Sequence, residues 1–411
     1  MTLKIEYNNF DFSSSQLQKS QDAASDATKI IIDSINNDSP YYKIFSTDLS
    51  KDMAKSCEQH AHELKSNFSD LIVIGMGGAV LNPESVLSLC QDNKSDINIH
   101  FLHNTDPIYL KNLLAKFVLK NCAVLAISNS GNTLETNSLV GVMMSEYEKA
   151  GIEELGKYFY FITNMKSGAL RGVAKRIDAT IIEHQSQISG RYSGLSNVTS
   201  FIAQVAGLDV DAFFTGAAEV IDNYIKDGSN SSPARSAVSI HASGLNMMVN
   251  IGYLQSFSTY LEWYSQIIAE SLGKDGGGIT PIRGLGPNDQ HSMMQLYLDG
   301  AKDKIYSLFY VDNLSSDFKT SDIDELDYAA NKALSDINAA NFEAVKLALI
   351  KRNLLVRTIL MDDLSAKSVG ALVAHSMLEI ITLCNMMKIN PFDQPGVELI
   401  KKESKRLILQ Y

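Results

Sequence analysis

A cluster of hydroxyl-bearing residues lies where a phosphate could bind. Ser128, Asn129, Ser130 and Thr133 follow an apolar run at 124–127 and precede a segment with a helical pattern. Backbone N–H groups at a helix N-terminus carry partial positive charge, and hydroxyl groups add donors, so a phosphate can be held there without a lysine. N-capping is the alternative explanation, but a cap needs one such side chain, whereas this loop offers three. The pattern therefore favours an anion-binding loop.

A second loop, rich in glycine, follows an earlier apolar run. Gly75, Gly77 and Gly78 come directly after residues 71–74. Open parallel sheets bind their ligands at the carboxyl ends of their strands, which is where these glycines are expected. Spacing excludes a dinucleotide fingerprint, because its third glycine would fall at position 80, which is Val80. A merely structural tight turn explains this loop equally well.

Three charged or titratable residues could move protons or stabilise charge. Glu270 lies in the last turn of a helical pattern that ends near Gly273, Arg191 lies between stretches rich in glycine and serine, and His291 lies in a proline-containing turn. Moving a carbonyl group between neighbouring carbons needs a base, and a permanent positive charge would stabilise the enediolate that forms. From the residues alone, a solvated glutamate, an ion-paired arginine and a structural histidine remain the simpler explanations.

The elements that must position these residues alternate as in an α/β protein. Five short apolar runs separated by helical stretches predict the buried parallel strands of a doubly wound sheet. These runs are 71–74, 97–102, 122–127, 158–162 and 179–182. A turn-rich stretch at 227–233 suggests a domain boundary, and strand-like runs at 304–311 and 354–360 predict a second α/β layer. Before the first sheet, a helix is expected over residues 14–35.

Composition excludes several classes of protein. Among 411 residues, 45% are hydrophobic and 20% are charged, which is the balance of a globular protein rather than a disordered or fibrous one. A net charge of −11 disfavours binding to nucleic acid or to an anionic membrane. The four cysteines lie far apart, without metal-ligand or redox spacing, so we expect a cytoplasmic protein without a metal. The sequence begins without the pattern of an export signal, and its apolar stretches are too short for a membrane span.

The hydroxyl loop resembles the phosphate-binding serine and threonine loop of the sugar isomerase (SIS) domain. Four further segments resemble phosphoglucose isomerase in the order found in that family, and the motifs together span residues 75–401. They are Ser-Gly-Arg-Tyr-Ser at 189–193, Gln-Ile-Ile-Ala-Glu-Ser-Leu-Gly-Lys at 266–274, Gly-Pro-Asn-Asp-Gln-His-Ser at 286–292 and Asn-Pro-Phe-Asp-Gln-Pro-Gly-Val-Glu at 390–398. The last segment is very specific, and the short chain resembles the compact bacterial form of the family.

This resemblance implies an enzyme that interconverts glucose 6-phosphate and fructose 6-phosphate, in glycolysis and gluconeogenesis, without a metal or organic cofactor. It implies that Glu270 transfers a proton between C1 and C2 and that Arg191 stabilises the enediolate. It also implies that His291 assists ring opening from the neighbouring subunit, which requires a homodimer, and that Lys401 contacts the substrate near its ring oxygen.

The remaining substrate contacts implied by the resemblance come from glycine, hydroxyl and amide groups. They are Gly77, Gly78, Ser128, Asn129, Ser130, Thr133, Gln266 and Gln394. The chain departs from the family at Asn129, where many relatives have lysine, at Ala79, where serine is common, and at Ser189, where glycine is common. We therefore expect weaker phosphate binding than in those relatives, or a positive charge supplied from elsewhere.

The motifs predict two SIS-type doubly wound α/β domains. The expected divisions are an N-terminal helical arm (1–48), a phosphate-binding domain (49–190), a connecting segment (191–234), a domain with the catalytic glutamate and histidine (235–389) and a C-terminal segment that brings Lys401 to the cleft (390–411).

Two other functions stay open at this point. One is a dual phosphoglucose and phosphomannose isomerase, which would use the same residues on a wider range of substrates. The other is a non-catalytic SIS protein that senses sugar phosphates, which would lack the base or carry a DNA-binding module, and the sequence shows neither feature.

Overall fold

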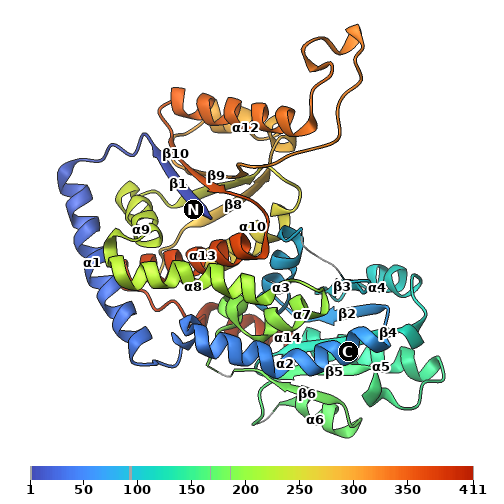
Figure 1. The fold of residues 1–411 in the computed structure, drawn as a ribbon. Helices are drawn as coiled ribbons and strands as arrows, with labels where there is room; N and C mark the ends of the chain where they lie inside the picture. Colours follow the sequence, from blue (N-terminus) through green and yellow to red (C-terminus); the bar gives the residue numbers. More distant parts are fainter. Residues whose placement is uncertain (1, 92–94, 167, 186, 411) are drawn as a thin grey trace.

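The protein consists of two α/β layers that pack against each other (Figure 1). The structure is a computed structural model and describes residues 2–91, 95–166, 168–185 and 187–410. Each layer contains a five-stranded sheet with helices on both faces. The predicted fold class is therefore confirmed.

The first sheet is entirely parallel, with the strand order β3-β2-β4-β5-β6. Its strands are β2 (Asp70–Ile74), β3 (Asn98–Leu102), β4 (Cys122–Ser128), β5 (Phe159–Thr163) and β6 (Thr180–Glu183). The chain passes from β2 to β3 on one side and from β4 to β5 on the other, so the strand order reverses between β2 and β4. Open α/β sheets bind ligands at the carboxyl ends of the strands at such a reversal.

Helices cover both faces of the first sheet. They are α2 (Thr47–Asn67), α3 (Gly78–Leu89), α4 (Pro107–Leu114), α5 (Leu134–Lys149), α6 (Ala169–Arg176) and α7 (Asn197–Val205). Successive residues of β2 face opposite cores, as strand geometry requires. Ile72 and Ile74 pack with α4, α5 and α6, whereas Leu71 and Val73 pack with α2 and α7. This two-sided burial explains why the strands appear in the sequence as short apolar runs.

The second sheet has the strand order β1-β10-β9-β7-β8. Its strands are β1 (Leu3–Asn8), β7 (Met247–Gly252), β8 (Thr280–Leu285), β9 (Ile305–Val311) and β10 (Leu355–Met361). The four later strands are parallel, whereas β1 pairs antiparallel with β10, from Leu3 opposite Met361 to Asn8 opposite Val356. The N-terminal segment therefore completes the second sheet.

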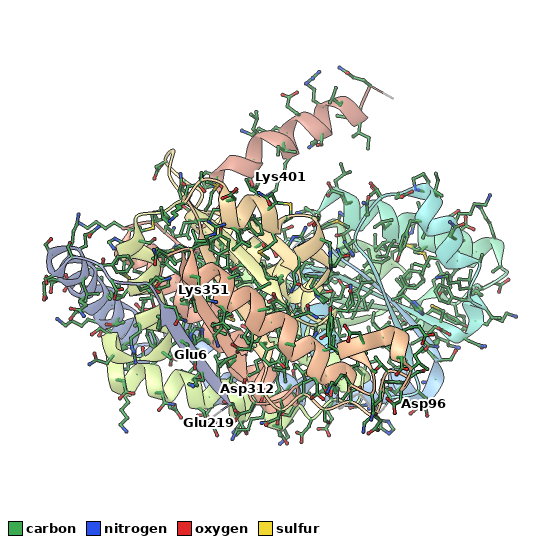
Figure 2. All side chains as sticks on the ribbon, turned by 90° about the horizontal axis from the view of Figure 1, so that it is seen from above. Glu6, Asp96, Glu219, Asp312, Lys351 and Lys401 are labelled. Carbon is green, nitrogen blue, oxygen red and sulfur yellow. The ribbon has the colours of Figure 1, made fainter. Side chains whose placement is uncertain are left out.

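The second sheet is also covered on both faces. Helices α11 (Met294–Asp299) and α12 (Leu334–Lys351) pack on one face, and α10 (Phe257–Leu272) and α13 (Ala366–Met386) pack on the other. Three more helices pack on α13, namely α1 (Ser14–Asn36), α8 (Val210–Asp227) and α9 (Ser232–Ser243). The last helix, α14 (Glu398–Ile408), has no buried residue and extends away from the body (Figure 2).

Helix α13 forms the centre of the second layer. Within the described residues it is the one helix long and apolar enough to cross a membrane by length and composition, and 94% of its apolar window is buried inside the protein. Its neighbours α1, α8, α9 and α10 account for this hydrophobicity, because they cover its surface.

Helices α3 and α10 join the two layers and run antiparallel. At one end, Ser88 Oγ of α3 donates to Ser256 O, just before α10, at 3.0 Å. At the other end, Gly77, just before α3, lies beside Gln266 of α10. Because α3 begins at the carboxyl edge of the first sheet, this packing brings the C-terminal half of α10 to that edge.

Most predicted elements are confirmed. The five strands of the first sheet end within one residue of the predicted positions, α1 occupies the helix expected at 14–35, and β9 and β10 occupy the two later runs. The patterns missed β1, β7 and β8, of which β7 is a largely buried strand. The helices on both sides of the turn at 227–233, α8 and α9, both pack against α13.

Candidate active site

The glycine loop lies against two other segments, which explains why it needs glycine. Gly77 has a φ of +53°, and a Cβ atom there would lie 2.7 Å from Gln266 Nε2. A Cβ atom on Gly78 would lie 2.1 Å from the carbonyl oxygen of Gly190, the first residue of η4 (Gly190–Leu195). The missing side chains therefore let α10 and η4 approach the carboxyl end of β2.

The hydroxyl loop at the end of β4 is held by its own hydrogen bonds. Ser128 Oγ lies 3.0 Å from Thr133 Oγ1 and accepts from Gly131 N at 3.1 Å, and Ser130 Oγ accepts from Asn132 N at 3.2 Å. Thr133 is the N-cap residue of α5, but its side chain makes no capping hydrogen bond to that helix. The loop thus places its hydroxyl groups beside the positive end of the α5 dipole.

Asn129 has a structural role in this loop. Its Nδ2 donates to the carbonyl oxygen of Ile188 at 3.0 Å, and its own carbonyl oxygen accepts from Asn164 Nδ2 at 2.6 Å. Ile188 lies three residues before Arg191, so Asn129 connects the hydroxyl loop to the segment that carries the arginine.

Arg191 is almost fully buried, with 2% of its surface exposed. Its Nη1 donates to the carbonyl oxygens of Glu270 (3.1 Å), Pro391 (3.0 Å) and Asp393 (3.3 Å). Its Nη2 donates to Asp393 O (3.3 Å) and Gln394 Oε1 (2.7 Å). Its Nε lies 2.9 Å from Glu270 Oε2, an ion-pair contact without hydrogen-bond geometry. The guanidinium is therefore fixed by its two Nη groups, and the buried Nε–H is left without a hydrogen bond.

Two buried contacts attach η4 to α10. The indole Nε1 of Trp263 donates to Arg191 O at 2.9 Å, and the hydroxyl of Tyr192 lies 2.7 Å from Ser271 Oγ. Burial raises the pKa of Tyr192 well above its ordinary value, so this phenol stays protonated and able to donate. The position of Arg191 thus depends on the position of α10.

Glu270 lies in the last turn of α10, beside Arg191. Its side chain is 31% exposed, and its Oε1 accepts from Gln266 Nε2, one helical turn earlier, at 3.0 Å. The other amide atom, Gln266 Oε1, is buried without a hydrogen-bond partner. The carboxylate is therefore flanked by a cation, the Arg191 guanidinium with which it forms an ion pair, and by an unused acceptor, Gln266 Oε1.

The C-terminal segment 390–394 forms one wall of this arrangement. Besides its contacts with Arg191, it is held by Lys274, whose Nζ lies 2.6 Å from Asp393 Oδ1 and also donates to Asn390 O. The side chain of Lys274 is 8% exposed. The sequence motifs included Lys274 without assigning it a role, and its place four residues after Glu270, just beyond the helix end, is the signal that could have identified it.

Two predicted residues are not brought to this site. His291 ends η6 (Asn288–His291), which follows the edge strand β8, and within the described residues its exposed side chain makes no hydrogen bond or ion pair. Lys401 is 61% exposed on α14 and pairs with Glu398 at 2.6 Å. The expectation that the C-terminal segment brings Lys401 to the cleft is therefore not met, because residues 390–394 enter the site while α14 extends away from it (Figure 2).

No metal centre is formed by the part of the chain that the structure describes. In these residues, no group of three or more His, Cys, Asp or Glu side chains is placed to hold a metal ion.

The chain is similar to known proteins of one family. Residues 33–303 match the family model of phosphoglucose isomerase. A glucose-6-phosphate isomerase from Methanocaldococcus jannaschii is 31% identical over 352 residues, which is 84% of this chain and 86% of the relative. A glucose-6-phosphate isomerase from Thermus thermophilus is 30% identical and covers 81% of this chain and 82% of its own.

Solved structures share the fold. The crystal structure of a hypothetical protein from Thermus thermophilus matches with a TM-score of 0.90 at 26% identity, covering 98% of this chain and all of the other. A glucose-6-phosphate isomerase from Chlamydia trachomatis matches with a TM-score of 0.76 at 24% identity, covering 90% of this chain and 74% of the other. With a family model that matches well over half of its length, this chain is an isomerase and belongs to the phosphoglucose isomerase family.

Proposed function

We propose that this isomerase interconverts D-glucose 6-phosphate and D-fructose 6-phosphate through an enediol or enediolate. The observation that carries this proposal is the ion pair of Glu270 with the buried Arg191 Nε, at 2.9 Å, beside Gln266 Oε1, which is buried without a hydrogen-bond partner. Buried polar groups in folded proteins nearly always have partners, and a bound ligand would supply the one that Gln266 Oε1 lacks. An open-chain hydroxyaldehyde offers an oxygen to the guanidinium and a hydroxyl group to Gln266 Oε1, with its acidic C–H bond next to the carboxylate.

Glu270 is the proposed base. Its carboxylate accepts the proton from C2 of the aldose, the C–H electrons form a C1–C2 double bond, and negative charge develops on O1. Arg191, which keeps its positive charge at any physiological pH, stabilises that oxygen. Return of the proton to C1, together with transfer of the hydroxyl proton from O2 to O1, gives the ketose. Each side chain ends as it began, so the cycle needs no other reactant.

The hydroxyl loop is the proposed phosphate site. Ser128, Ser130 and Thr133 lie at the reversal point of the first sheet and beside the α5 N-terminus, and Gly77 and Gly78 line the neighbouring strand end. Asn129 adds an amide but no charge. Gln394, hydrogen-bonded to Arg191, completes the proposed substrate contacts.

His291 and Lys401 are proposed to act in ring opening. Because His291 is exposed beside the open edge of the second sheet, we propose that it serves the site of a second subunit in a homodimer. Lys401 can reach the ring oxygen only if α14 turns toward the site. Its attachment through residues 390–394, which are already held there, makes such a turn feasible.

We further propose that the enzyme works in the cytoplasm, in glycolysis and gluconeogenesis. All four cysteines are free and buried, as suits a reducing compartment.

Residues 49–190 are the proposed phosphate-binding domain, and residues 235–389 are the proposed domain of the base. The N-terminal strand, within segment 1–48, pairs with the sheet of this second domain.

A coupled assay with glucose 6-phosphate and mannose 6-phosphate side by side tests this function. Reduction of NADP by a glucose-6-phosphate dehydrogenase, with fructose 6-phosphate as the starting substrate, reports the reverse reaction. Turnover of glucose 6-phosphate alone supports the proposal, and turnover of both sugars supports the dual isomerase. Binding of sugar phosphate without turnover would contradict both and favour a sensor.

A further inference from the structure

A charged cluster is buried behind the helix that carries Glu270. Arg357 of β10 is 0% exposed, and Glu379 of α13 and Tyr264 of α10 are each 2% exposed. Arg357 Nη1 donates to Glu379 Oε2 at 2.8 Å, and Arg357 Nη2 donates to Tyr264 OH at 2.6 Å. Tyr264 OH in turn donates to Glu379 Oε1 at 2.5 Å, and Arg357 Nε donates to Ser307 Oγ of β9 at 2.7 Å. The phenol thus closes a ring of hydrogen bonds between the sheet, α13 and α10.

Both ends of this ion pair are charged in the folded protein. Burial alone would raise the pKa of Glu379, but the Arg357 guanidinium holds it below its ordinary value. Burial opposes the charge on Arg357 as well, and the carboxylate of Glu379 more than restores it, so that its pKa is raised. A buried ion pair gives little net stability, and its better attested use is to fix one arrangement of the elements that hold it.

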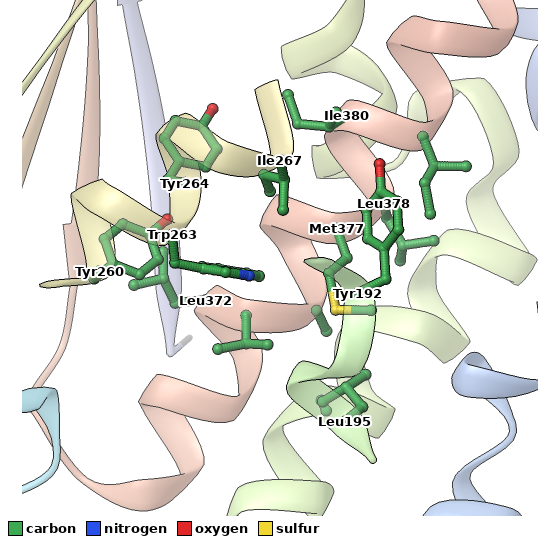
Figure 3. Packing of buried hydrophobic residues seen from close by; sticks show 14 of the residues in the cluster. Tyr192, Leu195, Tyr260, Trp263, Tyr264, Ile267, Leu372, Met377, Leu378 and Ile380 are labelled. Carbon is green, nitrogen blue, oxygen red and sulfur yellow. The ribbon is translucent and has the colours of Figure 1, made fainter. Parts of the chain in front are cut away.

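Two different faces of α10 have different tasks. Tyr264 precedes Glu270 by six residues, which is about 9 Å along the helix and, the shorter way, about 120° around it. Gln266 and Glu270, one turn apart, face the first domain, whereas Tyr260 and Tyr264, also one turn apart, face α13. Figure 3 shows these tyrosines on α10 beside the core residues of α13, and their rings stack at 5.9 Å. A shift of α10 that moves Glu270 must therefore also move Tyr264.

The cluster is sensitive to such a shift. Hydrogen bonds at 2.5–2.8 Å weaken steeply when their geometry changes, and a buried charge that loses a partner has no water to replace it. Tyr260 offers a contrast, because its hydroxyl contacts the neutral Ser376 Oγ at 2.8 Å. The charged ring therefore defines the position of α10 more strictly than the packing of the helix alone.

We propose that Tyr264 is a positioning residue for Glu270, and that the Arg357–Glu379 pair is the fixed reference against which it holds α10. Tyr264 touches no substrate and acts only through the helix. This role rests on the proposed function of Glu270 as the base. It gives a structural role to the buried Arg357–Glu379 pair, which takes no part in the reaction itself.

The test compares Tyr264→Phe with the matched variant Tyr260→Phe. Each substitution removes one buried hydroxyl from the same face of the same helix, and each is expected to lower the urea midpoint of unfolding, Tyr264→Phe more than Tyr260→Phe because its partners are charged. For Tyr264→Phe we expect kcat to fall at least about tenfold, because small displacements of a reacting group have effects of that size. KM and the Kd of 6-phosphogluconate should stay within about twofold, because the phosphate site lies on the other layer. Tyr260→Phe should keep kcat within about twofold.

Measurements at 25 °C on fully folded protein, checked by urea unfolding, separate positioning from stability. Wild-type kcat in Tyr264→Phe, or equal losses in both variants, would overturn the inference. If Tyr264→Phe does not fold, Ser307→Ala, which loosens Arg357 without touching α10, should lower kcat about threefold, and an unchanged kcat would again overturn it. These outcomes differ from those expected if the proposed function is wrong. In that case Glu270→Gln would keep its turnover, or the wild type would show no isomerase activity.

Discussion

Replacing Glu270 by glutamine removes one charge from the site while keeping the side-chain length. The amide oxygen introduced at this position can still accept from Gln266 Nε2, and Arg191 keeps its contacts with three carbonyl oxygens and with Gln394. Only the ion pair to Arg191 Nε is lost. Since the carboxylate is 31% exposed, this loss should lower the free energy of unfolding by no more than about 1 kcal/mol, or about 2 °C in Tm.

The effect on turnover should be far larger than the effect on stability. A positioned general base contributes roughly 10²–10⁴ in rate, so we expect kcat of Glu270→Gln to fall by at least about 10²-fold. Binding of 6-phosphogluconate should be unchanged or slightly tighter, because the variant removes a negative charge near an anionic ligand while Arg191 stays in place.

The assay is the coupled reaction with fructose 6-phosphate, together with thermal unfolding and inhibitor titration of the same samples. Glu262→Gln is the matched control, since Glu262 lies on the same helix and pairs with Arg283 at 2.8 Å, with both side chains about half exposed. It loses the same charge and an ion pair, and it should keep wild-type turnover. A kcat within tenfold of wild type for Glu270→Gln, or a similar loss in both variants, would refute the assignment of the base.

Three further outcomes are expected. Lys401→Ala should slow turnover more when the substrate is presented as the closed ring than as the open chain, and equal losses in rapid-quench kinetics would remove its ring-opening role. Lys274→Met should loosen segment 390–394, which contacts Arg191, by removing its ion pair with Asp393, and steady-state kinetics should show about a tenfold loss in kcat with a cooperative unfolding transition still present. Acid should destabilise the fold, because burial lowers the pKa of His184 and His375 to about 4 from 6.5, so that only the unfolded chain takes up these protons as the pH falls below 6.5. Between pH 7 and pH 5, each of these two histidines should lower the free energy of unfolding by about 2 kcal/mol. Urea titrations in which the stability of His184→Gln depends on pH as steeply as that of the wild type would contradict this role of His184.

The sequence predicted the first sheet well because of how that sheet is buried. Strands covered on both faces must be apolar at every position, and β4, buried along its whole length, is visible as such a run. The second sheet was predicted only in part. Strand β8 contains Pro281 and lies at an edge, β1 is a partly polar edge strand, and β7 places Asn250 in the core. These strands become recognisable only beside the partners that pair with them.

Prediction of the candidate site was limited by long-range packing rather than by residue type. The family motifs pointed to Arg191, Gln266 and Glu270. The last two lie one turn apart on α10, and Arg191 meets them because η4 packs on that helix, a contact that no local pattern encodes. Lys274 was overlooked because its partner, Asp393, lies more than a hundred residues away. For Lys401 the motif gave a role, but the direction of α14 depends on tertiary contacts that the motif does not contain.

Helix α10 illustrates why function and stability are divided between two faces of one element. One face leaves Gln266 Oε1 buried without a hydrogen-bond partner, beside the ion pair of Arg191 with Glu270, and the unpaired oxygen destabilises the protein in the absence of a ligand. On another face, Tyr264 bonds to both members of a buried ion pair, so that the helix has one strongly favoured position. Without this support, the polar atoms of the ligand-free site would move toward each other and form hydrogen bonds among themselves. The charged cluster holds the helix from a face about a third of a turn away and so prevents that rearrangement, which keeps Gln266 Oε1 available for a ligand.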